Sequence, residues 1–249
     1  MLPQHSRHCP VLEAGSAAGF MVYAPMEPRE SIHVSYEGDG VYKFVYFAQT
    51  QDGKTTPIFS VTMTLPVGGV GAMKEDVQLM SAASVTREAA LAVTRVFLVP
   101  EDMGTPPGAI ALRGAYNVKT PPGWDTLYTP IFNMIERPIA PMLIVRVETD
   151  WYAHETEFRY VLQPGEGITV SHAIPIGQIV FVPREDVTFR DSTEAEVEEQ
   201  QRTQSAFIRD KAAAAQTTPY GLTVSPHYLR ESRERRDSAK GAQKPDRHD

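Results

Sequence analysis

The chain has little of the residue chemistry that secreted and membrane-spanning proteins need. Its 249 residues include one cysteine, Cys9, so no disulfide can form within the chain. No apolar run in the sequence approaches the roughly 20 residues that span a bilayer. The first ten residues lack the apolar centre of a signal peptide. We therefore expect a cytoplasmic protein with no membrane partner.

Basic side chains are also in short supply. Lysine and arginine number 24 against 31 acidic residues, which gives a formal net charge of −7. A general nucleic-acid-binding protein shows a basic surface stripe. We therefore expect no nucleic-acid partner.

Turn-forming residues are abundant, with 20 prolines and 17 glycines spread along the chain. This distribution suits many short strands better than a helical bundle. Runs of β-branched, aromatic and alternating apolar residues predict strands at 19–24, 31–36, 41–49, 58–65, 109–118, 124–132, 143–147, 158–162, 168–170 and 174–182. The predicted fold is mainly β, an antiparallel jelly-roll or β-clip-like sandwich.

Two segments carry helical signals. Residues 193–215 begin after a capping serine or threonine, have acidic first turns and few apolar positions, and predict a helix on the surface. Residues 84–97 fit a helix capped by Ser84, or a strand over their last part, 93–99; we predict the helix. Between 66 and 83, the glycine-rich stretch lacks the Gly-Lys-Ser/Thr ending of a phosphate-binding loop, so we expect a flexible connection.

These patterns divide the chain into four parts. We expect an N-terminal arm over 1–10, a β-rich domain over 11–190 and a C-terminal helix over 191–216. Residues 217–249 are predicted to be an extended to disordered tail, because the last 20 residues contain almost no large apolar side chain.

The most informative stretch runs from 141 to 184. An apolar strand there ends in Glu148, Thr149, Asp150 and Trp151, and functional residues often lie where a strand passes into a loop. Glu148 and Asp150 are i and i+2 on a strand, so they share a face, and their repulsion would raise one carboxyl pKa and suit acid–base catalysis. Alternatively, they are exposed charges, or Asp150 caps a turn.

Other candidates surround this pair. Arg184, which follows a strand, either binds a ligand carboxylate or phosphate or forms a surface salt bridge. Gln178 is polar within an apolar strand and contacts either a ligand or the backbone. Four aromatic residues either line a pocket or pack in the core: Trp124, Tyr128, Trp151 and Tyr152.

A metal site is a further hypothesis. His154, Glu157 and His172 combine a His-x-x-Glu pair with a distant histidine, as in cupin-like barrels that ligate iron or zinc. The His-x-His pair common at such sites is missing, and exposed histidines at strand ends are the alternative. The sequence names no cofactor.

Four pieces of the sequence resemble the dUTPase and dCTP-deaminase families. They are Gly15-Ser16-Ala17-Ala18-Gly19-Phe20 with Tyr23-Ala24-Pro25, then Pro122-Gly123-Trp124, Val147-Glu148-Thr149-Asp150-Trp151, and Ile174-Pro175-Ile176-Gly177-Gln178-Ile179-Val180-Phe181. The resemblance implies a compact jelly-roll-like β fold that is often trimeric. The chain is also similar to uncharacterised bacterial proteins with a Thr-Asp-Trp segment before a Pro-Ile-x-Gln strand.

The resemblance does not carry the nucleotide activity to this chain. The family's phosphate-gripping Arg-Ser pair is replaced by Thr129-Pro130-Ile131-Phe132, and its glycine-rich C-terminal arm is absent. Glu148 stands where the family has its water-activating aspartate. A triphosphate needs several cations, metal ligands or backbone amides to offset its charge.

Three functions follow as hypotheses. The first is a bacterial protein that binds a polar small molecule at the acidic and aromatic strand end, and transforms it if Glu148 and Asp150 are catalytic. The second is a metal-dependent cupin-like enzyme. The third is a non-catalytic structural or interaction protein, for which the resemblance implies a homo-oligomer.

Overall fold

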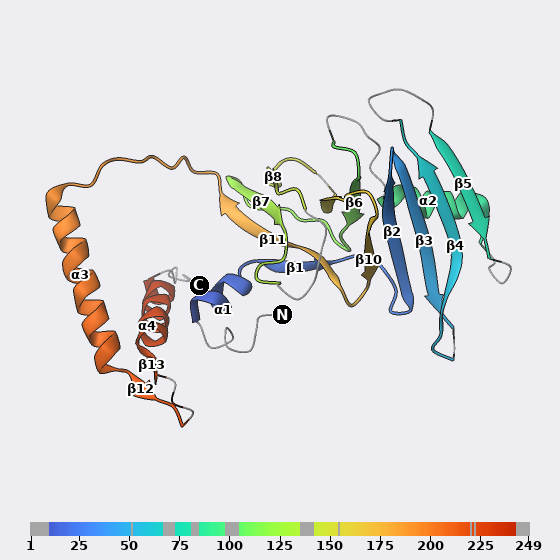
Figure 1. Ribbon diagram of the computed structural model, residues 1–249. Helices are drawn as coiled ribbons and strands as arrows, with labels where there is room; N and C mark the ends of the chain where they lie inside the picture. The colour runs from blue at the N-terminus through green and yellow to red at the C-terminus, as the bar shows by residue number, and fades with distance from the viewer. Residues whose placement is uncertain are drawn as a thin grey trace, which may run out of the picture. The chain divides into compact units, whose positions relative to one another are not determined.

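The computed structural model describes residues 10–50, 52–66, 73–80, 85–97, 105–134, 142–153, 155–219, 221 and 223–242. Val11–Glu185 belong to one compact unit, and Asp186–Asp249 to a second. The first unit contains a five-stranded sheet, a four-stranded sheet and a two-stranded sheet. The second contains two helices and a short hairpin (Figure 1). The mainly β, antiparallel fold with a C-terminal helix is confirmed. The finer jelly-roll or β-clip assignment stays a prediction.

A five-stranded antiparallel sheet forms one side of the first unit. Its strand order is β10-β2-β3-β4-β5, with β2 at Glu30–Gly38, β3 at Val41–Gln49, β4 at Thr55–Thr64, β5 at Lys74–Leu79 and β10 at Glu166–Ser171. The β2–β3 turn has positive φ at Gly38, Asp39 and Gly40, as the Gly-Asp-Gly sequence predicts. Strand β5 corrects the expected flexible connection over 66–83, because part of that segment pairs with β4.

A four-stranded antiparallel sheet carries the candidate site. Its order is β1-β11-β7-β8, with β1 at Phe20–Tyr23, β7 at Trp124–Thr129, β8 at Val145–Val147 and β11 at Pro175–Pro183. Strands β6 (Ala109–Arg113) and β9 (Glu157–Val161) form a two-stranded ladder of their own. Helix α1 (Pro10–Ser16) precedes β1, so the Gly15-Ser16 part of the dUTPase-like segment lies at the end of a helix.

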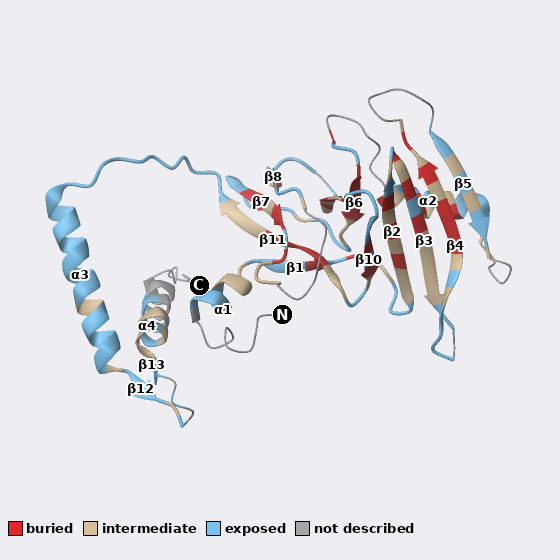
Figure 2. Ribbon diagram, in the orientation of Figure 1, coloured by how far each residue is buried: buried red, intermediate tan, exposed pale blue. Residues whose placement is uncertain are grey.

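One hydrophobic core joins these elements. It draws side chains from all three sheets, for example Phe44, Ile110 and Ile179 (Figure 2). Helix α2 (Arg87–Phe97) adds Ala90 and Phe97, and the Phe97 ring stacks on Phe44 with centroids 5.9 Å apart. The helix prediction for 84–97 is confirmed over Arg87–Phe97. The predicted cap, Ser84, lies outside the described residues, and the Thr86 hydroxyl accepts from the Ala89 amide in the first turn.

The second unit begins with an extended segment and α3 (Glu194–Ala213). A capping box starts α3: the Thr193 hydroxyl accepts from the Glu196 amide, and the Glu196 carboxylate accepts from the Thr193 amide. No residue of α3 is buried, in agreement with the predicted surface helix. A short hairpin follows, β12 (Gln216–Thr217) with β13 (Thr223–Val224), and then helix α4 (His227–Ala242). The chain was predicted to be extended to disordered over 217–249, but residues 227–242 form a helix. Residues 243–249 lie outside the described residues, as do residues 1–9 of the predicted 1–10 arm, and Pro10 begins α1.

Candidate functional site

The candidate site lies where three strands of the four-stranded sheet end together. The pairing places Trp124, the first residue of β7, opposite Pro183, the last residue of β11. Val147, the last residue of β8, pairs with Thr126 of β7. Segments that are distant in sequence, around 125, 148–152 and 184, thus meet at one end of this sheet (Figure 1).

Asp125 is the buried centre of an ionic network. Its side chain is 3% exposed. One carboxylate oxygen accepts from Arg146 Nε at 2.6 Å, and the other accepts from Arg184 Nη2 at 2.6 Å and Nε at 2.8 Å. A buried carboxylate needs such partners, because an unpaired buried charge is strongly destabilising.

Arg184 connects Asp125 to the loop after β8. Its Nη2 also donates to Asp150 Oδ1 at 2.6 Å, and its Nη1 lies 3.4 Å from Glu148 Oε2. The second oxygen of Asp150 accepts from the Gly123 amide at 3.0 Å. Gly123 has φ +79°, a backbone conformation that residues other than glycine adopt rarely. Asp150 therefore caps the Pro-Gly-Trp turn, the structural alternative raised from the sequence.

Both aspartates are held in the ionised form. The hydrogen bond from Arg184 is the main cause that lowers the pKa of Asp125, and Arg146 adds to it. The Arg184 hydrogen bond, followed by that from Gly123, lowers the pKa of Asp150. From the sequence we expected repulsion between Glu148 and Asp150 to raise a carboxyl pKa, but the pKa of Asp150 is shifted in the opposite direction. A carboxylate with a depressed pKa and occupied oxygens is a poor proton shuttle near neutral pH.

Glu148 holds the Trp151 side chain, whereas Asp150 holds the turn at Gly123. Its side chain is about half exposed, and its Oε2 accepts a short hydrogen bond from Trp151 Nε1. Because this bond holds the edge of the indole, it restrains the orientation of the Trp151 ring.

A cluster of buried threonine hydroxyls lies under the loop. Thr149 Oγ1 is 2.7 Å from Thr126 Oγ1 and 2.9 Å from Thr120 Oγ1. Thr120 also donates to the Trp124 carbonyl at 2.6 Å. All three threonines are buried, so this cluster and the ionic network fix residues 148–150 from two directions.

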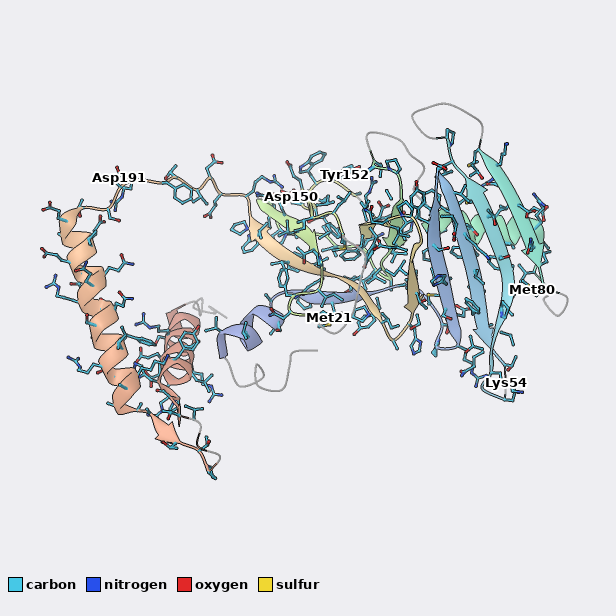
Figure 3. The ribbon with its side chains drawn as sticks, in the orientation of Figure 1. Met21, Lys54, Met80, Asp150, Tyr152 and Asp191 are labelled. Atoms are coloured by element: carbon cyan, nitrogen blue, oxygen red, sulfur yellow. The ribbon has the colours of Figure 1, made fainter. Side chains whose placement is uncertain are left out.

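Beside the loop lies a cavity of about 340 Å³. Its lining residues are Asn117, Val118, Lys119, Thr149, Asp150, Trp151, Tyr152, Ala153 and Glu155. We call it the Trp151–Tyr152 cavity. The rings of Trp151 and Tyr152 contact each other, with centroids 5.7 Å apart and planes at 51°. Nevertheless Trp151 is 69% and Tyr152 48% exposed. Figure 3 labels Asp150 and Tyr152 in this loop.

The remaining predicted ligand contacts lie elsewhere. Tyr128 is buried and packs edge-on against Phe158, so it belongs to the core. Gln178 is buried as well; its Oε1 accepts from the Phe132 amide and its Nε2 donates to the Ala18 carbonyl. Trp124 is partly exposed at the start of β7 but does not line the cavity.

The predicted metal ligands are not brought together in the described part of the chain. Glu157 accepts from Arg159 at 2.8 Å, and His172 is exposed in the turn between β10 and β11. His154 lies outside the described residues. Among those that are described, no three histidine, cysteine, aspartate or glutamate side chains are grouped so that they could hold a metal ion.

Sequence reasoning missed two residues of the ionic network, Asp125 and Arg146. Asp125 carried a signal, since it is an acidic residue within a strand-forming run. Its partners could not be assigned without the pairing of β7 with β8 and β11.

Comparison with known proteins adds no assignment. No protein-family model, curated protein or solved structure matches the chain. In the described residues, no helix combines the length and apolar character needed to cross a membrane.

Proposed function

We propose that this protein binds a small polar molecule with a flat ring in the Trp151–Tyr152 cavity. One observation carries the proposal: two adjacent aromatic side chains stay largely exposed on a loop whose backbone is firmly fixed. Exposed aromatic area is unfavourable in water, and aromatic side chains provide rigid binding surface at low entropic cost. A volume of about 340 Å³ is within the range of small-molecule sites.

The loop is already ordered before a ligand binds, which supports the proposal. Asp150 is bonded through both oxygens, and Thr149 is buried in the hydroxyl cluster. Such a loop presents its rings in one arrangement before a ligand arrives, which reduces the entropy cost of association. The same occupied oxygens argue against Asp150 as a general base, so we propose binding and assign no catalytic step.

A larger hollow in the second unit supports binding less well. It has a volume of about 800 Å³, but its lining residues all belong to α3. A surface formed by one helix encloses a ligand on one side only, whereas binding sites bury most of their ligand.

The test uses the two tryptophans of the chain as a matched pair. Wild type, Trp151→Ala and Trp124→Ala would be screened by thermal shift against ring-bearing and ringless polar small molecules. A ligand at 100 times its Kd should add about 2.7 kcal/mol of stability. We expect ring-bearing molecules to raise the Tm of wild type and of Trp124→Ala but not of Trp151→Ala. Equal shifts in both variants, or no shift with any ring-bearing molecule, would overturn the proposal.

A further inference from the structure

The carboxylates that line the Trp151–Tyr152 cavity already have cationic partners. Asp150 accepts from Arg184 and from the Gly123 amide. Glu155 is paired with Arg113 at 2.9 Å. A positively charged ligand would have to compete with these arginines for the acidic oxygens.

The uncommitted polar groups of the cavity are donors. Lys119 is exposed, and within the described residues it has neither a hydrogen bond nor an ion pair. Asn117 Oδ1 accepts from the Thr156 amide at 2.9 Å. Because a backbone N–H can only donate, this bond fixes the amide orientation and leaves Asn117 Nδ2 as the available group.

Trp151 presents the face of its indole ring to a ligand rather than its polar edge. Trp151 Nε1 donates to Glu148, so the polar edge of the indole is already occupied. The Trp151 and Tyr152 rings line the same cavity as Lys119 and Asn117. A sphere of the cavity's volume is about 9 Å across, which suits one ring system with one short substituent.

We infer that the cavity selects a ring-bearing anion, whose carboxylate, phosphate or sulfate group is held by Lys119 and Asn117 and whose ring lies against Trp151 and Tyr152. This inference rests on the proposed function and specifies its ligand class. The anionic group receives the Lys119 ammonium and the Asn117 amide as donors, and the ring covers the exposed aromatic area.

The test compares three probes that share an indole ring and differ in charge: indoleacetate, indoleacetamide and tryptamine. Their dissociation constants for the full-length chain would be measured by ligand-observed NMR. We expect indoleacetate to bind about tenfold more tightly than indoleacetamide, the effect of one charge-assisted hydrogen bond, and tryptamine to bind most weakly.

Two lysine variants localise the effect. Lys119→Gln should weaken indoleacetate binding about tenfold and leave indoleacetamide unchanged. Lys54→Gln removes the same charge at the β3–β4 turn, where Lys54 is paired with Asp52 at 3.6 Å and lies away from Tyr152 (Figure 3). This control should leave all three dissociation constants unchanged.

The outcomes separate the two proposals. If indoleacetamide or tryptamine binds as tightly as indoleacetate, and Trp151→Ala abolishes that binding, the ligand class is wrong but the binding site stands. An equal effect of Lys54→Gln and Lys119→Gln would also overturn the ligand class, since a general charge effect would explain it. If none of the three probes binds, the ligand class is wrong, and the thermal-shift screen decides whether the binding site stands. If the probes bind and Trp151→Ala changes none of the constants, both proposals fail.

Discussion

The two units of this chain are stabilised in different ways. All the buried hydrophobic residues among those described lie in the first unit, between Val22 and Ile179. In the second unit, α3 buries none, and Val187 and Phe189 are 76% and 95% exposed. Figure 2 shows the contrast between strands with buried positions and a helix that is mostly exposed.

The difference shows which forces specify each part. The first unit depends on apolar burial and on a buried ionic network, which are properties of tertiary structure. The second relies on local signals: the Thr193 capping box, the Arg190–Glu196 pair and the Glu199–Arg202 pair. In proteins most helical stability comes from tertiary packing of an apolar face, and α3 buries no residue.

The largest expected effect is on the core of the first unit. Phe44→Ala should lower the free energy of unfolding by about 3–5 kcal/mol, because Phe44 is fully buried between Phe59 and Phe97. The matched variant is Phe207→Ala in α3, whose ring contacts His227 with centroids 4.9 Å apart. It should cost less than about 1 kcal/mol.

Both tryptophans belong to the first unit, so denaturation followed by tryptophan fluorescence measures that unit. Similar losses for Phe44→Ala and Phe207→Ala in this signal would contradict the comparison, since they would make α3 part of the same core.

The second expected effect is a loss of stability in acid. The folded-state pKa values of Asp125 and Asp150 are lowered, chiefly by Arg184. Their contribution is therefore complete above the unfolded pKa of about 4, and it is lost as the pH falls below that value toward the folded pKa. Fluorescence-detected unfolding should show wild type losing stability as the pH falls below the unfolded carboxyl pKa of about 4.

Asp125→Asn provides the control for this pH dependence. The variant should be less stable than wild type at pH 7. The difference should shrink as the pH falls below about 4, because the unfolded wild-type chain then binds a proton at Asp125 that the folded, arginine-paired carboxylate resists. In the second unit, Arg190 is the main cause that lowers the pKa of Glu196 to about 2. Glu196→Gln should therefore reduce the far-UV helical signal at pH 7 and leave the fluorescence transition unchanged. A constant difference between Asp125→Asn and wild type from pH 7 to pH 2 would refute the ionic role of Asp125.

The same division explains what the sequence could predict. The alternation of apolar and polar residues over 58–65 predicted β4 with its apolar face inward. The residues of that face, Phe59, Val61 and Met63, are buried. Strand β5 was missed because Lys74–Leu79 is mostly polar and largely exposed, so its pairing with β4 leaves no apolar alternation to detect. Helix α4 was missed for a related reason, because its sequence is charged and has almost no large apolar residue. The signal that could have revealed it is the i, i+4 pair Glu231–Arg235, which favours a helix.

The candidate site, too, could be predicted only in part from the sequence. The 148–151 segment and Arg184 were identified from their places at strand ends, and the structure brings Arg184 to Glu148 and Asp150. The lowered pKa of Asp150 could not be predicted, because its main cause is a hydrogen bond from Arg184, which lies 34 residues further along the chain. Asp125 and Arg146 meet only through the register of β7 with β8. Pairing between distant strands is a property of topology, which local sequence patterns do not specify.

The N-terminal cap of α3 should have a small effect that is confined to this helix. Thr193→Ala removes the hydroxyl that accepts from the Glu196 amide and should cost the helix about 1 kcal/mol. Thr203→Ala makes the same chemical change at an exposed position inside α3, where alanine is the better helix former by about 0.5 kcal/mol. The first variant should lower and the second should raise the helical content of 194–213, measured from backbone NMR shifts of the full-length chain. Neither should move the fluorescence transition of the first unit. If both variants changed the helix in the same direction, α3 would be held by tertiary contacts, and the contrast between the two units would be lost.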